Sequence, residues 1–131
     1  MNILKKSVAL LSSVLIAVTA FAGEFPDISI SEVKALLGTT KATIIDVNGT
    51  DSYNSGHVPG ALNFDVVEAN LAKVLPENKD ALIIAYCGNP RCSAYQAAAK
   101  AAEKLGYKNV KHMSAGIAGW KKAGEKTEAV K

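Results

Sequence analysis

Two mostly apolar runs dominate the pattern of hydrophobic and polar positions. Residues 42–47 and 81–86 are rich in Ile, Ala and other apolar side chains and show little alternation with polar ones. Runs of this kind are typical of strands buried on both faces of a parallel sheet. We therefore expect these two strands at the centre of the fold. Weaker strand candidates are residues 28–30, 60–64 and 109–113.

The segments between these strands carry helical signals. Ser31 is a suitable N-cap for a first helix, Pro76 would stop a later one, and Gly106 follows an alanine-rich stretch that favours helix. Strands that alternate with helices predict an α/β fold, a three-layer sandwich with a mostly parallel central sheet. The expected helices are residues 32–37, 51–56, 66–75, 92–105 and 117–123.

The first 22 residues have the pattern of a secretory signal peptide. Two lysines precede an apolar run over residues 8–21, and small residues stand at Ala20 and Ala22. A spanning helix needs about 20 apolar residues, and this run is shorter. We therefore expect residues 1–22 to be removed, the protein to be exported to the periplasm, and no stable membrane anchor to remain after cleavage.

The remaining residues, 23–131, have the length of one compact domain. The chain ends in a polar tail from about residue 125 that has little to bury, and we expect this tail to fray. Loss of Lys5 and Lys6 leaves 13 basic against 12 acidic residues and lowers the formal charge from +3 to +1. Basic residues are mixed with acidic ones, so we expect no nucleic-acid partner.

A short loop carries the candidate chemistry. Residues 87–93 join the expected strand 81–86 to the alanine-rich helix, at the strand end where α/β folds bind ligands. Main-chain N–H groups at such a turn favour an anion. The pKa of a free thiol is about 8.5, and this setting would lower it. We therefore expect Cys87 to be largely ionised and nucleophilic at neutral pH. The rest of the substrate-binding loop is Gly88, Asn89, Pro90, Arg91, Cys92 and Ser93.

Two residues of this loop have more than one interpretation. Arg91 is the single arginine of the chain, and it either contacts an anionic substrate or is a solvated surface residue. Cys92 could be a resolving thiol that attacks an oxidised or persulfidated Cys87, it could form a disulfide with Cys87, or it could be a small residue without chemistry. The sequence leaves these alternatives open.

Three short motifs in order resemble the single-domain rhodanese family. Residues 44–47 (IIDV) with 56–61 (GHVPGA) are similar to its first signature, and residues 85–94 are similar to its catalytic loop in position and length. Residues 105–110 (LGYKNV) and 115–120 (AGIAGW) resemble its closing signature. The similarity runs from about residue 30 to residue 124, so the chain is identified as a member of that family.

The resemblance implies a sulfurtransferase that holds sulfane sulfur as a persulfide on Cys87. Thiosulfate or another sulfane-sulfur donor would load the cysteine, and a small nucleophile such as cyanide or a thiol would accept the sulfur, so the partners are small anionic or thiol molecules and no cofactor is needed. Two positions depart from the family pattern. Cys92 stands where many members have a basic or hydroxyl residue, and Asn48 stands where an arginine is common.

Other candidate residues are interpreted as structural. Asp46 at a strand end is expected to accept hydrogen bonds from main-chain N–H groups, although it could also be a charge partner for the loop. His57 is expected to fix its own turn by hydrogen bonding and is not assigned as a general base. His112 has no second ligand at suitable spacing, so no metal site is expected. Two other functions stay open: a thiol-disulfide or redox-sensing protein that uses Cys87 and Cys92, and a catalytically silent rhodanese-fold binding module. A phosphatase is disfavoured because its arginine would stand at Ser93.

Overall fold

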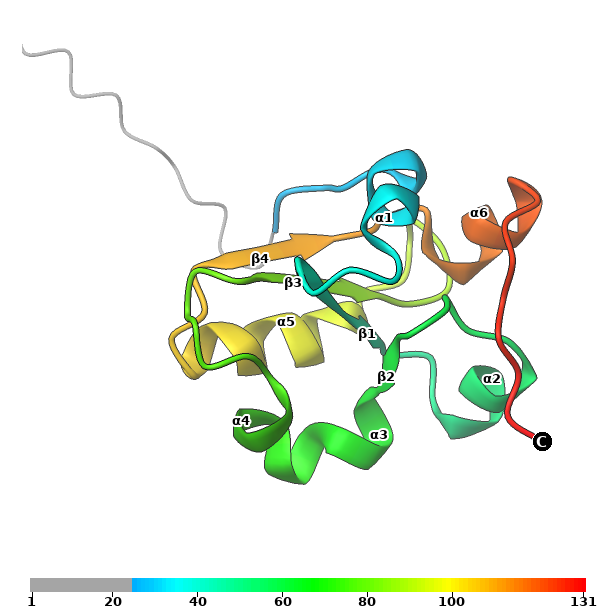
Figure 1. Ribbon diagram of the computed structural model, residues 1–131. Coiled ribbons are helices and arrows are strands. Elements are labelled where there is room, and N and C mark those ends of the chain that lie inside the picture. Colours follow the sequence, from blue (N-terminus) through cyan, green and yellow to red (C-terminus); the bar gives the residue numbers. More distant parts are fainter. Residues whose placement is uncertain (1–24) are drawn as a thin grey trace, which may run out of the picture.

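A four-stranded parallel sheet forms the middle of the molecule in the computed structural model, which describes residues 25–131 (Figure 1). The expected signal peptide lies outside the described residues. The strand order is β2-β1-β3-β4, and each neighbouring pair is parallel. This architecture confirms the predicted α/β class. The strands are β1 (Ala42–Asp46), β2 (Leu62–Asn63), β3 (Leu82–Tyr86) and β4 (Asn109–His112).

The two apolar runs are the central strands, as their composition predicts. β1 and β3 pair along their whole length, and Asp46 at the end of β1 lies opposite Tyr86 at the end of β3. The chain leaves β1 toward β2 on one side and returns to β3 on the other. Ligand sites of open α/β sheets lie at such a switch point, outside the carboxyl ends of the strands. The loop after Tyr86 begins there.

Helices cover both faces of the sheet (Figure 1). Ile84 faces a core that contains Val33, Met113 and Trp120, whereas its neighbour Ile83 faces the opposite core with α5. Successive residues of a strand point to opposite faces, so a continuous apolar run supplies both cores. The helical elements are α1 (Ile30–Leu36), α2 (Thr50–Ser55), α3 (Phe64–Val67), the 3₁₀ turn η1 (Glu68–Asn70), α4 (Leu71–Val74), α5 (Tyr95–Lys104) and α6 (Gly116–Lys122).

The first helix begins earlier than the sequence predicts. Ser29, not Ser31, is the N-cap: its Oγ accepts a hydrogen bond from the Glu32 N–H at 3.1 Å and donates to the Glu32 carboxylate at 3.0 Å. The spacing of Ser29 and Glu32 is that of a capping box, which outweighs a single N-cap candidate. The expected strand over residues 28–30 is therefore wrong, although Ile28 N–H still donates to the His112 carbonyl at 2.9 Å.

The single helix expected over residues 66–75 is also wrong, because α3, η1 and α4 follow one another there. Asn63 caps α3 by accepting a hydrogen bond from the Asp65 N–H. The backbone then leaves the helical region at Asn70, where φ is −133° and ψ is 33°. This break lets Leu71 and Phe64 both reach the core.

The C-terminal tail is held against the domain and does not fray as expected. Trp120 Nε1 donates to the Lys126 carbonyl at 2.8 Å, and His57 and Glu128 exchange two main-chain hydrogen bonds of 2.9 Å. Val130 N–H donates to the Asn54 carbonyl at 2.9 Å. The tail therefore runs past α6 and α2 (red in Figure 1). The tail takes part in these hydrogen bonds through its own main-chain groups, which composition does not report.

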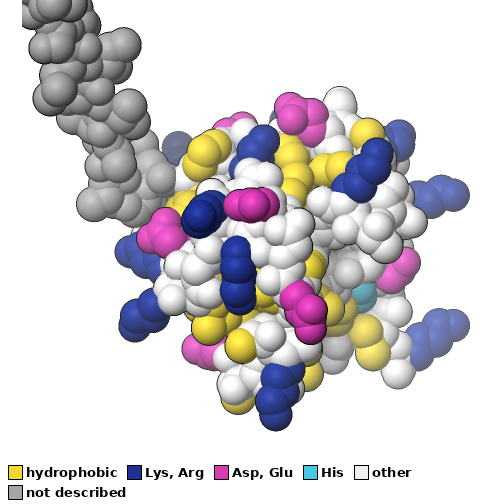
Figure 2. All heavy atoms as spheres, turned by 60° about the vertical axis from the view of Figure 1, so that its left-hand side comes forward, with side chains coloured by type: hydrophobic (Ala, Val, Ile, Leu, Met, Phe, Trp, Pro, Cys, Tyr) yellow, Lys and Arg dark blue, Asp and Glu magenta, His cyan; other side chains and the backbone are white. Residues whose placement is uncertain are grey.

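The surface carries charges of both signs. On the face shown in Figure 2, Lys and Arg side chains are interspersed with Asp and Glu side chains rather than gathered in one patch. Within residues 25–131, the helices are all too short or too polar to cross a membrane.

Candidate functional site

The cysteine loop spans residues 87–94, between the end of β3 and the start of α5. The sequence places the helix start at Cys92, but α5 begins at Tyr95. The cause is a tight turn at Asn89, whose side-chain Oδ1 accepts from the Arg91 N–H at 2.9 Å and whose carbonyl accepts from the Cys92 N–H at 3.1 Å. The helix propensity of the alanines predicts α5, but it contains no information about the turn at Asn89 that delays the start of the helix.

Cys87 and Cys92 are joined by a disulfide. Their Cα atoms are 6.2 Å apart, within the range that a disulfide spans. Cys87 is 1% exposed and belongs to the core beneath α5, whereas Cys92 is only partly buried at the edge of that core. Of the three interpretations of Cys92, the structure contains the disulfide, and in this state neither sulfur is a free thiol.

Several main-chain N–H groups of the loop have no hydrogen-bond partner among the described residues. The N–H groups of Arg91 and Cys92 are occupied by Asn89. Those of Gly88, Asn89 and Ser93 donate to no other residue within 25–131. Free N–H groups beside a sulfur stabilise negative charge on it or on a bound anion.

The N-terminus of α6 supports the loop from behind. Ile117 N–H donates to the Cys87 carbonyl and Ala118 N–H to the Gly88 carbonyl, both at 2.9 Å. Gly116 has φ of +64°, and a Cβ there would lie 2.6 Å from the carbonyl carbon of Gly88. The two backbones can approach this closely only because Gly116 has no side chain. The sequence shows this glycine only as part of the closing motif.

Asp46 lies level with the loop but is bonded into the frame of the fold. Its carboxylate is 1% exposed; Oδ2 accepts from the Tyr86 hydroxyl at 2.5 Å and Oδ1 from the Asn48 N–H at 2.8 Å. The Tyr86 hydroxyl also accepts from the Val58 N–H at 3.0 Å. Burial, together with the Asp46 carboxylate, raises the pKa of Tyr86, so its hydroxyl remains a donor. Asp46 thus ties β1 to β3 immediately before the loop.

His57 lies in the turn before β2. Its Nδ1 is 2.8 Å from the Tyr53 carbonyl, its ring stacks on the Tyr53 ring with centroids 3.7 Å apart, and its Nε2 is 3.7 Å from the Glu128 carboxylate. These partners belong to α2 and the tail. Among the contacts of the described residues, none joins His57 to the cysteine loop.

Asn48 was not among the site residues taken from the sequence, yet it faces the loop. Its Oδ1 lies 3.6 Å from the place that a Cβ on Gly88 would occupy. Its Nδ2 is buried and has no hydrogen-bond partner in residues 25–131. The sequence marks Asn48 by its place directly after the Asp-Val strand end, where the family commonly has an arginine. Over the same range, no three His, Cys, Asp or Glu side chains come together to hold a metal ion.

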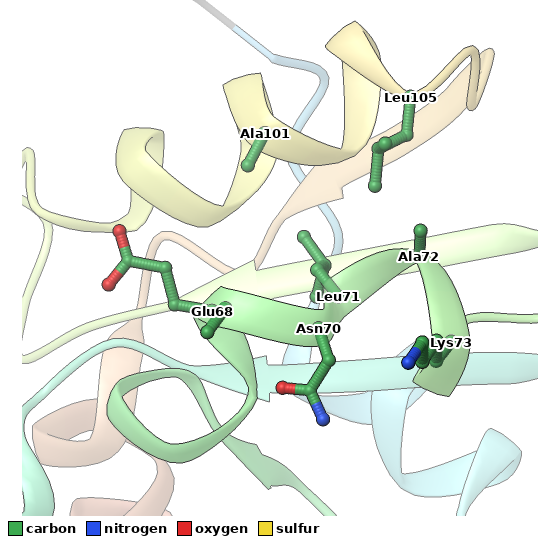
Figure 3. Close-up of a pocket in the computed structure, with 8 residues that line it drawn as sticks. Glu68, Asn70, Leu71, Ala72, Lys73, Ala101 and Leu105 are labelled. Carbon is green, nitrogen blue, oxygen red and sulfur yellow. The ribbon is translucent and has the colours of Figure 1, made fainter.

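Two hollows flank α5 at opposite ends. At its N-terminal end a pocket of about 300 Å³ is lined by Arg91, Cys92 and Ser93 of the loop, so these predicted site residues share one surface. Toward its C-terminal end a pocket of about 360 Å³ lies between α4 and α5, as Figure 3 shows for Leu71 and Ala101. Of these two pockets, the first is lined by a cysteine, Cys92, and the second is not.

Residues 29–123 match the family model described as rhodanese-like domain. The chain belongs to the rhodanese-like domain family. The thiosulfate sulfurtransferase GlpE of Pseudoalteromonas translucida is 33% identical over 106 residues, which cover 79% of this chain and 97% of that protein. These findings confirm the family and connect the chain to a sulfurtransferase-like group.

Two further similar proteins differ in how much of their length is matched. The solution structure of the rhodanese-like domain of an Anabaena protein has a TM-score of 0.64 and 27% identity, over 82% of this chain and 81% of that one. The HTH-type transcriptional regulator Rv0324 of Mycobacterium tuberculosis is 35% identical over 85 residues. That match covers 64% of this chain but only 36% of the regulator.

Proposed function

We propose that this protein is a rhodanese-type sulfurtransferase in which Cys87 carries sulfane sulfur as a persulfide. The observation that supports this most is the place of Cys87: it follows β3 at the carboxyl edge of the sheet, next to the unpaired N–H groups of Gly88, Asn89 and Ser93. A thiolate and the persulfide that succeeds it are both anions that such donors stabilise. The similarity to a thiosulfate sulfurtransferase agrees with this chemistry.

The transfer proceeds in two displacements. The Cys87 thiolate attacks the outer sulfur of thiosulfate, the bond between the two sulfurs of thiosulfate breaks, and sulfite leaves with the electron pair. A nucleophile such as cyanide or a thiolate then attacks the outer sulfur of the persulfide and releases the Cys87 thiolate. Covalent catalysis divides one difficult transfer into two easier ones.

The disulfide makes reduction a condition of activity. Sulfur transfer starts from a free thiolate, whereas the Cys87 sulfur is bonded to Cys92 in the structure. A thiol reductant therefore has to open the bridge before the first turnover. The oxidised protein is expected to be inactive and the reduced protein active.

Sulfur transfer from thiosulfate to cyanide tests the proposal, with matched serine variants of the two cysteines. The reduced wild type and Cys92→Ser should form thiocyanate, and Cys87→Ser should not. Polysulfide should be tried as a second donor because Cys92 replaces a residue type common in the family. If no donor gives transfer with the reduced wild type, the sulfurtransferase proposal fails, and a thiol-disulfide protein or a catalytically silent rhodanese-fold binding module remains.

A second candidate, a thiol-disulfide protein, is favoured by the Cys87–Cys92 bridge itself. This function needs a reversible midpoint potential for the bridge and exchange with other dithiols. Cys92→Ser discriminates the two candidates, because it should abolish redox exchange and leave sulfur transfer in place.

We also propose that the protein is exported to the periplasm after loss of residues 1–22, and that its partners are small anionic or thiol molecules. The mixed charges in Figure 2 suit small substrates better than a nucleic-acid backbone. Intact mass of the protein from a periplasmic fraction checks the cleavage: a mature chain should begin at Gly23. A full-length chain in the cytoplasm would contradict export.

A further inference from the structure

The two sulfurs of the disulfide differ in their access to solvent. Cys87 is 1% exposed within the core beneath α5, whereas Cys92 is partly exposed and lines the pocket at the N-terminal end of that helix. Thiol–disulfide exchange requires the attacking thiolate to reach one sulfur while the other leaves. In this fold a thiolate can reach Cys92, and Cys87 is then the leaving group.

The pocket at Cys92 has the character of a site for a small anion. Its volume is about 300 Å³, at the low end for small-molecule sites. Arg91 lines it and supplies a permanent positive charge, and among the described residues 25–131 no Asp or Glu side chain lines it. Ser93 and Ser114 line it as well and carry hydroxyl groups that can hydrogen-bond a carboxylate.

His112 gives independent support for a polar ligand in this pocket. Its side chain is 8% exposed, lines the pocket, and stacks on the Tyr95 ring with centroids 3.4 Å apart. Its Nε2 is buried and has no hydrogen-bond partner within residues 25–131. A buried polar atom without a partner is unfavourable, and a polar ligand group at this end of the pocket would supply one.

We propose that this pocket binds a small carboxylate-bearing thiol, which opens the disulfide at Cys92 and frees Cys87. The thiol loses its proton to solvent, and its thiolate attacks Cys92 Sγ. A new S–S bond joins the thiol to Cys92 as the Cys87–Cys92 bond breaks, and Cys87 Sγ leaves with the electron pair as a thiolate. The reverse attack by Cys87 expels the thiol and closes the bridge again.

The inference rests on the proposed function in one respect: the thiolate released here is the nucleophile of sulfur transfer. Gly88 and Asn89 directly follow Cys87 in the chain, and their N–H groups have no hydrogen-bond partner within residues 25–131. Such donors would stabilise the departing Cys87 thiolate and favour it as the leaving group. Cys92, held as a mixed disulfide, cannot reclose the bridge until its thiol leaves. The pocket thus determines which sulfur is liberated, and the surrounding thiol pool determines what fraction of the protein is active.

Glutathione, a thiol with two carboxylates, is the probe that tests this. Oxidised protein is mixed briefly with glutathione, quenched with acid, alkylated with N-ethylmaleimide and digested with trypsin. Cleavage after Arg91 separates the peptides that contain Cys87 and Cys92. Glutathione should be found on the Cys92 peptide and maleimide on the Cys87 peptide. Glutathione on the Cys87 peptide, in equal or greater amount, would overturn the inference, as would an absence of any adduct.

Arg91→Gln tests the charge recognition. Intact mass should show glutathione opening the bridge about 2- to 5-fold more slowly in this variant, as expected for the loss of one exposed charge pair. 2-Mercaptoethanol, an uncharged thiol without a carboxylate, should open both proteins at similar rates. Equal slowing with both thiols would contradict anion binding by Arg91.

A separate measurement keeps this inference distinct from the proposed function. Protein reduced completely with a phosphine is incubated with thiosulfate and tested for sulfur on Cys87. Sulfur loading together with glutathione on Cys87 would leave the sulfurtransferase intact and remove the pocket's role. Glutathione on Cys92 without any sulfur on Cys87 would support the role of the pocket and contradict the proposed sulfur transfer.

Discussion

Gly116→Ala tests whether close contact with α6 fixes the shape of the cysteine loop. The new Cβ would lie 2.6 Å from the carbonyl carbon of Gly88 and 2.7 Å from the Asn89 nitrogen. Carbon atoms in contact are ordinarily about 3.5–4.0 Å apart, so the loop has to retreat by about 1 Å. A misplacement of that size can lower a reaction rate by about 10²-fold, and we expect that loss in sulfur transfer.

Gly124→Ala is the matched control. Gly124 also has a positive φ, +76°, but no atom lies within 4 Å of a Cβ built there. Both variants should lose about 1–2 kcal/mol of unfolding free energy from left-handed strain. Gly116→Ala should lose about 1–3 kcal/mol more from overpacking.

Urea unfolding and sulfur transfer by the reduced proteins measure the two effects. Gly124→Ala should keep nearly all of its transfer rate. Equal rates in the two folded variants would refute the claim that α6 sets the loop geometry.

Three further predictions concern the frame around the site. Tyr86→Phe removes one donor to the Asp46 carboxylate and leaves the Val58 N–H unpaired. Urea unfolding should show that the unfolding free energy falls by about 1–3 kcal/mol for each of these groups. Tyr53→Phe removes one hydrogen bond to the Ala61 carbonyl and should lower the unfolding free energy by less. Burial lowers the pKa of His112 below 6.5 despite the opposing charge of Asp27, so the unfolded chain takes up a proton first as the pH falls. The unfolding free energy should therefore have its full value above about pH 6.5 and decrease as the pH falls below that. His112→Gln should remove part of this decrease. A pH profile that is the same in the variant and the wild type would contradict this. Ending the chain after Glu125 removes the hydrogen bonds of the tail. The unfolding free energy should fall by about 0.5–1.5 kcal/mol for each bond, which thermal unfolding would show as a lower Tm. An unchanged Tm would show that the tail does not stabilise the domain.

The sequence predicts the centre of the fold well because its signals there are local. The continuous apolar runs of β1 and β3 report burial on both faces, and the order of strands and helices restricts the topology to a few choices. The position of Cys87 after β3 follows from the same pattern. Helix boundaries are predicted less well, because Ser29 and Ser31 are both acceptable caps and only the capping box with Glu32 separates them.

Other features depend on contacts between distant segments and leave no local signal. The approach of Gly116 to Gly88 brings the first residue of α6 against the cysteine loop, and nothing near Gly116 in the sequence reveals its neighbour. The two hydrogen bonds between Glu128 and His57 are made by main-chain groups, which every residue carries. The three interpretations of Cys92 differ by sulfur position and oxidation state, which composition does not encode.

The most direct test of the account is the mass of the reduced protein after incubation with thiosulfate and removal of the donor. The account predicts a protein heavier by one sulfur atom, with the added sulfur on the peptide that contains Cys87, lost on addition of cyanide and absent from Cys87→Ser. An unmodified Cys87 after exposure to thiosulfate and to polysulfide, in protein shown to be reduced and folded, would contradict the proposed chemistry.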